Sequence, residues 1–105
     1  MSSNLKEKIY NVQLYLNDCS IISLKSVGLS SLDALRNVLR LNGCGSFSQL
    51  EINSFSKDKI NFNNLTSDSH CYALVQLVDG KRKSERCFFV KTVANLISDC
   101  RWSSF

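Results

Sequence analysis

The sequence predicts an α+β fold: a single compact domain, residues 1–105, with a mainly antiparallel sheet of five or six strands and two helices packed on one face. Several segments alternate apolar and polar residues with the period of two that marks a strand, and two others repeat apolar residues at helical spacing. The order hairpin-then-helix also occurs twice, in residues 8–42 and 71–100, without residue identity between the two copies. The pattern therefore predicts two ββα-like halves, in a chain whose length suits one domain.

The first half begins with a predicted β-hairpin. Apolar and polar residues alternate over residues 9–16, so the even-numbered side chains from Tyr10 onward should face the core. Asn and Asp at positions 17–18 favour a tight turn, because both tolerate a left-handed backbone. Residues 19–27 are predicted to return as the second strand, which ends at Gly28.

The first helix is predicted to follow this hairpin. Ser30 is a residue type that caps helix N-termini, and Asp33 stands three positions later, as in a weak capping box. Gly43 supplies a C-terminal stop. The apolar stripe of this helix consists of Leu32, Leu35, Val38 and Leu39.

The middle of the chain predicts shorter elements. A strand is expected within residues 47–55, a turn at Lys57 and Asp58, and a short strand over residues 59–62. Residues 63–69 are polar throughout, which is typical of a loop.

The second half repeats the order of the first. Residues 71–78 form an almost continuous apolar run, as expected of a central strand with both faces covered. Asp79-Gly80 predicts a hairpin turn, and the partner strand should lie around residues 84–90. Apolar residues at helical spacing predict a second helix over residues 92–100, after which Trp102 and Phe105 should fold back onto the core.

Composition places the chain among ordinary globular proteins. It is 44% hydrophobic and 21% charged, and no apolar run approaches the roughly 20 residues that span a bilayer. The polar start lacks the apolar stretch of a secretion signal. Five widely spaced cysteines, an odd number, do not suggest a disulfide framework. We therefore expect a cytoplasmic protein.

No recognisable catalytic, metal or cofactor signature is present. There is one histidine, no two cysteines stand two to four residues apart, and glycine-rich phosphate loops and paired carboxylates are missing. The sharpest catalytic alternative pairs a Cys44 nucleophile with His70 as its base. The simpler interpretation is that Gly43 ends the helix and Cys44 packs beneath it. We therefore predict a non-enzymatic protein without a cofactor.

Basic residues are the main candidates for binding a partner. The hairpin after residues 79–80 carries a cationic cluster that could contact a phosphate backbone or an acidic protein surface. Two arginines four residues apart should project from the exposed face of the first helix. One aromatic on the polar face of the first strand could anchor a partner. The candidate partner-binding residues are thus Tyr15, Arg36, Arg40, Lys81, Arg82, Lys83 and Arg86.

These observations favour a small protein-interaction module, an inhibitor that binds a larger protein or nucleoprotein partner. The alternative is a small nucleic-acid-binding protein that uses the basic hairpin. Small one-domain chains of this profile are common among phage and mobile-element inhibitors of host systems, anti-CRISPR proteins among them. Size and composition carry that last expectation, because no motif in the chain identifies a family.

Overall fold

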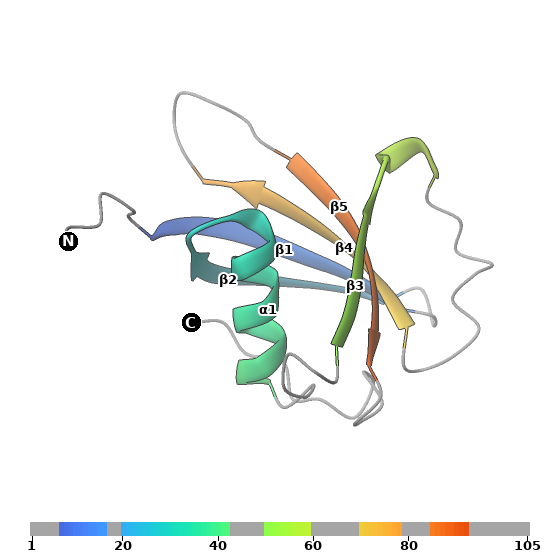
Figure 1. Ribbon diagram of the computed structural model, residues 1–105, viewed down its shortest axis with the longest axis horizontal. Helices are drawn as coiled ribbons and strands as arrows, with labels where there is room; N and C mark the ends of the chain where they lie inside the picture. The colour runs from blue at the N-terminus through green and yellow to red at the C-terminus, as the bar shows by residue number, and fades with distance from the viewer. Residues whose placement is uncertain (1–6, 17–19, 43–49, 60–69, 79–84, 93–105) are drawn as a thin grey trace.

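Five strands form one antiparallel sheet, and one helix lies across it, in the computed structural model (Figure 1). The structure describes residues 7–16, 20–42, 50–59, 70–78 and 85–92. The strand order is β2-β1-β4-β5-β3. In chain order the elements are β1 (Lys8–Leu16), β2 (Ile21–Gly28), α1 (Ser31–Leu41), β3 (Leu50–Phe55), the 3₁₀ turn η2 (Lys57–Lys59), β4 (His70–Leu77) and β5 (Glu85–Thr92).

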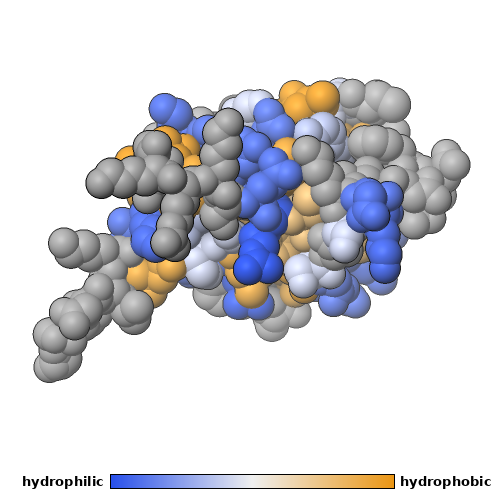
Figure 2. Space-filling model, turned by 90° about the horizontal axis from the view of Figure 1, so that it is seen from above, coloured by the Kyte–Doolittle hydropathy of each residue, from blue (hydrophilic) through white to orange (hydrophobic). Residues whose placement is uncertain are grey.

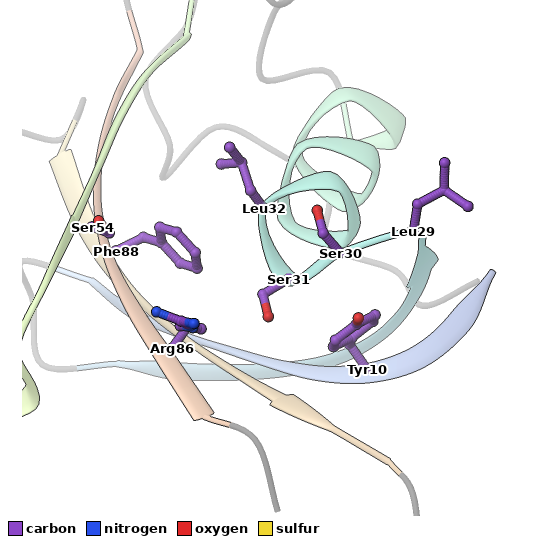
Figure 3. Close-up of a pocket in the computed structure, with 8 residues that line it drawn as sticks. All are labelled: Tyr10, Leu29, Ser30, Ser31, Leu32, Ser54, Arg86 and Phe88. Carbon is purple, nitrogen blue, oxygen red and sulfur yellow. The ribbon is translucent and has the colours of Figure 1, made fainter. Parts of the chain in front are cut away.

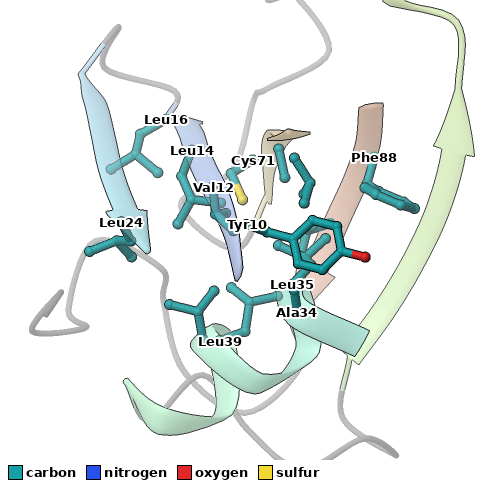
Figure 4. Close-up of a cluster of buried hydrophobic side chains, with 14 residues drawn as sticks. Tyr10, Val12, Leu14, Leu16, Leu24, Ala34, Leu35, Leu39, Cys71 and Phe88 are labelled. Atoms are coloured by element: carbon teal, nitrogen blue, oxygen red, sulfur yellow. The ribbon is translucent and has the colours of Figure 1, made fainter. Parts of the chain in front are cut away.

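Strand periodicity decides which side chains form the core. The even-numbered side chains of β1 from Tyr10 to Leu16 are all buried, as predicted. In register they pair with Ile22, Leu24 and Ser26 of β2 and with Cys71, Ala73, Val75 and Leu77 of β4. All of these side chains therefore point to the face that α1 covers. The buried cluster between sheet and helix is drawn in Figure 4.

Helix α1 begins and packs as its sequence predicts. The side chain of Ser30 accepts a hydrogen bond from the backbone N–H of Asp33 at 3.2 Å, which confirms the N-cap. The Asp33 carboxylate accepts in turn from the Leu29 N–H at 2.8 Å. The apolar stripe enters the core, where Leu35 and Leu39 have no exposed surface.

The helix lies unusually close to the end of β2. The hydroxyl of Ser26 donates to the carbonyl of Ala34 at 2.7 Å, and the Asn37 amide donates to the carbonyl of Val27 at 2.8 Å. A Cβ atom on Gly28 would lie 2.5 Å from the Ala34 backbone nitrogen. Glycine is therefore needed at this position because the helix backbone occupies the space of a side chain.

Strand β4 is the central strand that the apolar run predicts. Cys71 to Val75 are consecutively buried, so both faces of this strand are covered. On the face away from α1, the ring of Phe89 on β5 packs edge-on against Tyr72, with centroids 5.4 Å apart. It also lies 5.3 Å from the ring of His70. A strand between two others, with apolar side chains on both faces, accounts for this pattern.

Three sequence-based expectations change in the structure. Thr92, predicted to begin the second helix, instead ends β5, where it pairs with Leu50 and extends the ladder. Lys59, predicted to begin a strand, closes η2 by donating its N–H to the Ser56 carbonyl at 3.0 Å. His70, which precedes the predicted central strand 71–78, is already the first residue of β4 and pairs with Lys91.

The architecture is thus a compact α+β domain with one sheet and one helix in the part of the chain that the structure describes. The remainder of the predicted second helix, residues 93–100, and of the predicted short strand, residues 60–62, lies outside the described residues. The two ββα-like halves are therefore not confirmed. No helix among the described residues is long and apolar enough to cross a membrane.

Candidate functional site

A groove of about 450 Å³ lies between the N-terminal turn of α1 and the strands that the helix leaves uncovered (Figure 3). Helix α1 packs mainly on β2, at one edge of the sheet. Helix α1 therefore does not cover the ends of β5 and β3 on the same face. The groove is lined by Tyr10, Leu29, Ser30, Ser31, Leu32, Ser54, Arg86 and Phe88.

Register places Arg86 on the groove side of the sheet. Arg86 pairs with Val75, a core residue on the helix-covered face, and Phe88 follows two positions later on the same side of β5. The Arg86 side chain is exposed, and no acidic group in the described part of the chain forms an ion pair with it. The groove thus contains a guanidinium whose donors are available to a ligand.

Tyr10 brings a hydroxyl to the same groove. Its ring belongs to the core cluster and only 4% of the residue is exposed, while its oxygen points out of the cluster on the side of Phe88 (Figure 4). The described residues give this hydroxyl no hydrogen bond. Burial, and secondarily the negative charge of Asp33, raises the pKa of Tyr10 above its ordinary value of 10.0. At neutral pH the group is therefore protonated and able to donate.

Serine hydroxyls and apolar side chains complete the lining. The hydroxyls of Ser31 on α1 and Ser54 on β3 make no hydrogen bond with any other described residue, whereas the Ser30 hydroxyl accepts one in the helix cap. Figure 3 shows Arg86 and Phe88 on one side of the groove and the first turn of α1, with Leu32, on the other. The groove therefore combines one cation and several donors with an apolar wall.

This arrangement suits recognition of an oxygen-rich anionic group. A guanidinium and hydroxyls donate to carboxylate or phosphate oxygens, and such charge-assisted bonds are stronger than neutral ones. Metal chemistry has no counterpart here, because no three His, Cys, Asp or Glu side chains of the described residues come together to hold an ion. The volume falls within the roughly 300–1,000 Å³ typical of ligand sites.

The structure separates the candidate residues that the sequence singled out. Of the four candidates that the structure describes, Arg86 alone lines the groove. Tyr15 lies on the opposite face of the sheet, where its hydroxyl donates to Gln13 Oε1 at 3.0 Å. On α1, Arg36 is half-buried and Arg40 is exposed, and neither lines the groove. The remaining three, Lys81, Arg82 and Lys83, lie outside the described residues.

Sequence reasoning missed the other polar members of the groove. Tyr10 was predicted to face the core, which is correct for its ring but leaves out its hydroxyl. One signal was available: it is the single residue with a polar atom in an otherwise aliphatic stripe. Ser31 and Ser54 carried no comparable signal, because only the sheet brings β3 beside β5 and opposite α1.

The described structure provides no catalytic geometry for the alternative pair, Cys44 and His70. Cys44 lies outside the described residues, and His70 points to the face away from the groove, with its Nδ1 buried and without a hydrogen-bond partner among the described residues. The neighbouring Cys71 enters the core on the helix side. Neighbouring side chains on a strand point to opposite faces, so His70 and Cys71 cannot share one metal ion.

The face of the sheet away from α1 offers a second depression, of about 380 Å³. Its side chains are mostly neutral and polar, and Gln76 donates to the Glu85 carboxylate at 2.7 Å nearby. In the view of Figure 2 hydrophilic side chains form a central band between apolar ones, the usual mixture of a protein surface. The groove beside α1 is the stronger candidate, because its donors lack partners within the described structure.

Comparison of the chain with protein-family models, curated proteins and solved structures gave no match. Its function therefore has to be inferred from the chemistry of the groove.

Proposed function

We propose that this chain is a small non-enzymatic protein-interaction module, an inhibitor that binds a larger protein or nucleoprotein partner through the groove beside α1. One observation carries the proposal: the guanidinium of Arg86 and the hydroxyls of Tyr10 and Ser31 meet at one groove without partners among the described residues. These donors face solvent, so a ligand can replace their water with its own oxygen atoms, and the charge-assisted bonds to the guanidinium are the stronger ones.

The apolar wall supports a protein partner. Phe88 is already 95% buried at one end of the groove, so the exposed apolar surface comes mainly from Leu29, which is 47% exposed at the other end, and from the half-buried Leu32 (Figure 3). A side chain of a partner could cover this apolar surface while a neighbouring polar group reaches Arg86. Aromatic and arginine anchors surrounded by smaller contacts are the usual composition of a protein–protein hot spot. Occupation of a partner's acidic surface by such a module would block other ligands of that surface by electrostatic complementarity.

A nucleic-acid ligand is the second candidate, because Arg86 also follows the basic residues 81–83 in sequence. Tracking a phosphate backbone requires several cations along one path. The described lining of the groove contains a single cation. Lys25 and Lys91 lie on the opposite face of the sheet, and Lys8, on the same face as Tyr10, does not line the groove. The groove itself therefore favours a protein partner.

The test is affinity capture from a lysate of the native host, split into nuclease-treated and untreated halves, with wild-type protein and two variants. Arg86→Glu reverses the charge in the groove. Lys91→Glu makes the same change on the same strand, but on the opposite face and at an exposed position. Circular dichroism of both variants checks that the fold is retained. The captured partner's activity is then assayed with increasing amounts of the chain.

We expect a stoichiometric protein partner that resists nuclease, is lost with Arg86→Glu, is kept with Lys91→Glu and is inhibited on binding. Capture that disappears after nuclease treatment would contradict the proposal and favour the nucleic-acid alternative. Equal capture by wild type and both variants would exclude the groove as the binding surface.

A further inference from the structure

We infer that the groove beside α1 recognises one carboxylate next to an apolar side chain, in an acidic-apolar peptide segment of the partner. This inference rests on the proposed function and specifies which segment of the partner the groove binds. It assigns the carboxylate to Arg86 and the Tyr10 hydroxyl, and the apolar side chain to the wall formed by Phe88 and Leu32.

The polar half of the groove fits a carboxylate. Arg86 presents donors in a planar fork that matches two carboxylate oxygens, and it has no competing acid among the described residues. Tyr10 keeps its proton, since burial and Asp33 both disfavour the phenolate, so its hydroxyl can donate to an anion. The Asp33 charge also repels an anion at this oxygen, so Arg86 supplies the main attraction. Ser31 adds a third hydroxyl from the first turn of α1.

The first turn of α1 contributes less positive partial charge than an uncapped helix N-terminus would. Asp33 accepts the Leu29 N–H, and Ser30 accepts the Asp33 N–H, so part of the N-terminal dipole is already neutralised. An anion in the groove must therefore be held mainly by Arg86 and Tyr10. A singly charged carboxylate matches one arginine, whereas a doubly charged phosphate in this position would leave charge uncompensated.

The apolar part of the groove determines which type of residue fits next to the carboxylate of the partner. Phe88 and Leu32 stand on opposite sides of the groove in Figure 3, with the polar groups between them and Tyr10. A segment that places a carboxylate at Arg86 therefore brings its adjacent side chains against these two walls. Leucine or another aliphatic residue beside the acid would bury this surface, and the chain's net charge of +4 favours approach of an acidic segment.

The inference is tested on the full chain by two-dimensional ¹⁵N NMR titration with two isosteric peptides, acetyl-Leu-Glu-Leu-amide and acetyl-Leu-Gln-Leu-amide. The variants are Arg86→Gln, Tyr10→Phe and, as the control on the opposite face of β5, Lys91→Gln. Tyr10→Phe removes the hydroxyl and keeps the buried ring, so it leaves the core packing intact. A single-stranded oligonucleotide and inorganic phosphate serve as competing anions.

We expect the Glu peptide to shift amide signals of the first turn of α1 and of β5 around Arg86, with affinity about tenfold above that of the Gln peptide. Arg86→Gln should remove this difference, Tyr10→Phe should weaken the Glu peptide severalfold, and Lys91→Gln should change neither. Equal binding of the two peptides, or no binding, would overturn the carboxylate assignment, and the protein-capture experiment would still decide the proposed function. Tighter binding of the oligonucleotide or phosphate at the same amides would also overturn it.

Discussion

The close contact between α1 and β2 makes Gly28→Ala the sharpest test of the fold that holds the groove. The added Cβ would meet the Ala34 nitrogen at 2.5 Å and the Ala34 Cα at 2.9 Å. Ordinary contact begins near 3.4 Å, so the helix would have to move by about 0.9 Å. The atoms in the way are helix backbone, which cannot rotate aside as the end of a side chain can.

The size of the effect follows from two opposing terms. Replacing glycine by alanine lowers the entropy of the unfolded chain, which by itself would stabilise the protein by about 0.4–1 kcal/mol. Overpacking costs about 1–3 kcal/mol, and the upper end applies because a shift of α1 also loosens the fully buried Leu35 and Leu39. We expect a net loss of about 2 kcal/mol in the free energy of unfolding, which corresponds to roughly 8–16 °C in Tm.

The assay is urea unfolding followed by circular dichroism, with Ser23→Ala as the control. Ser23 is an exposed residue of the same strand whose side chain points to the opposite face, so its variant should stay within about 0.5 kcal/mol of wild type. A Gly28→Ala variant as stable as wild type would refute the reasoning, because it would mean that α1 does not rest on the backbone of β2.

Three further predictions concern the helix and the groove. Ser30→Ala should lower the free energy of unfolding by about 1 kcal/mol through loss of the helix cap, while Ser31→Ala, next to it, should change it by much less in the same urea assay. Leu35→Ala should lower the free energy of unfolding by about 2–5 kcal/mol because the side chain is fully buried. Leu41→Ala, at a position 52% exposed, should change it by no more than about 0.5 kcal/mol. Similar losses in both variants would contradict the packing of α1. The raised pKa of Tyr10 means that the unfolded chain loses this phenolic proton at a lower pH than the folded protein, so the free energy of unfolding should fall as pH rises from about 10 toward the folded pKa. Urea unfolding at about pH 9 and about pH 11 should show a smaller fall in Tyr10→Phe than in wild type, and an equal fall would show that the Tyr10 proton is not held more tightly in the fold.

Local sequence patterns predicted the parts of this fold that depend on neighbouring residues. The burial of alternate residues in β1, the Ser30 cap, the stripe of α1 and the central position of β4 are all confirmed. Each follows from a periodicity or a capping bond within a few residues of the chain. The same local reasoning was wrong at Thr92, because cross-strand pairing with Leu50 extends β5 past the point where helical spacing begins.

Only the tertiary structure decided which of these elements share a surface. The sequence by itself determined an α+β chain with a capped helix and alternating strands, but strand order and register depend on contacts between distant residues. Register places Tyr15 and Arg86 on opposite faces of the sheet, although both were candidates for one binding surface. It also brings the hydroxyl of Tyr10, the first turn of α1 and Arg86 to one groove from three separate elements. No local pattern encodes that convergence, because it arises only when α1 covers one edge of the sheet and leaves β5 open.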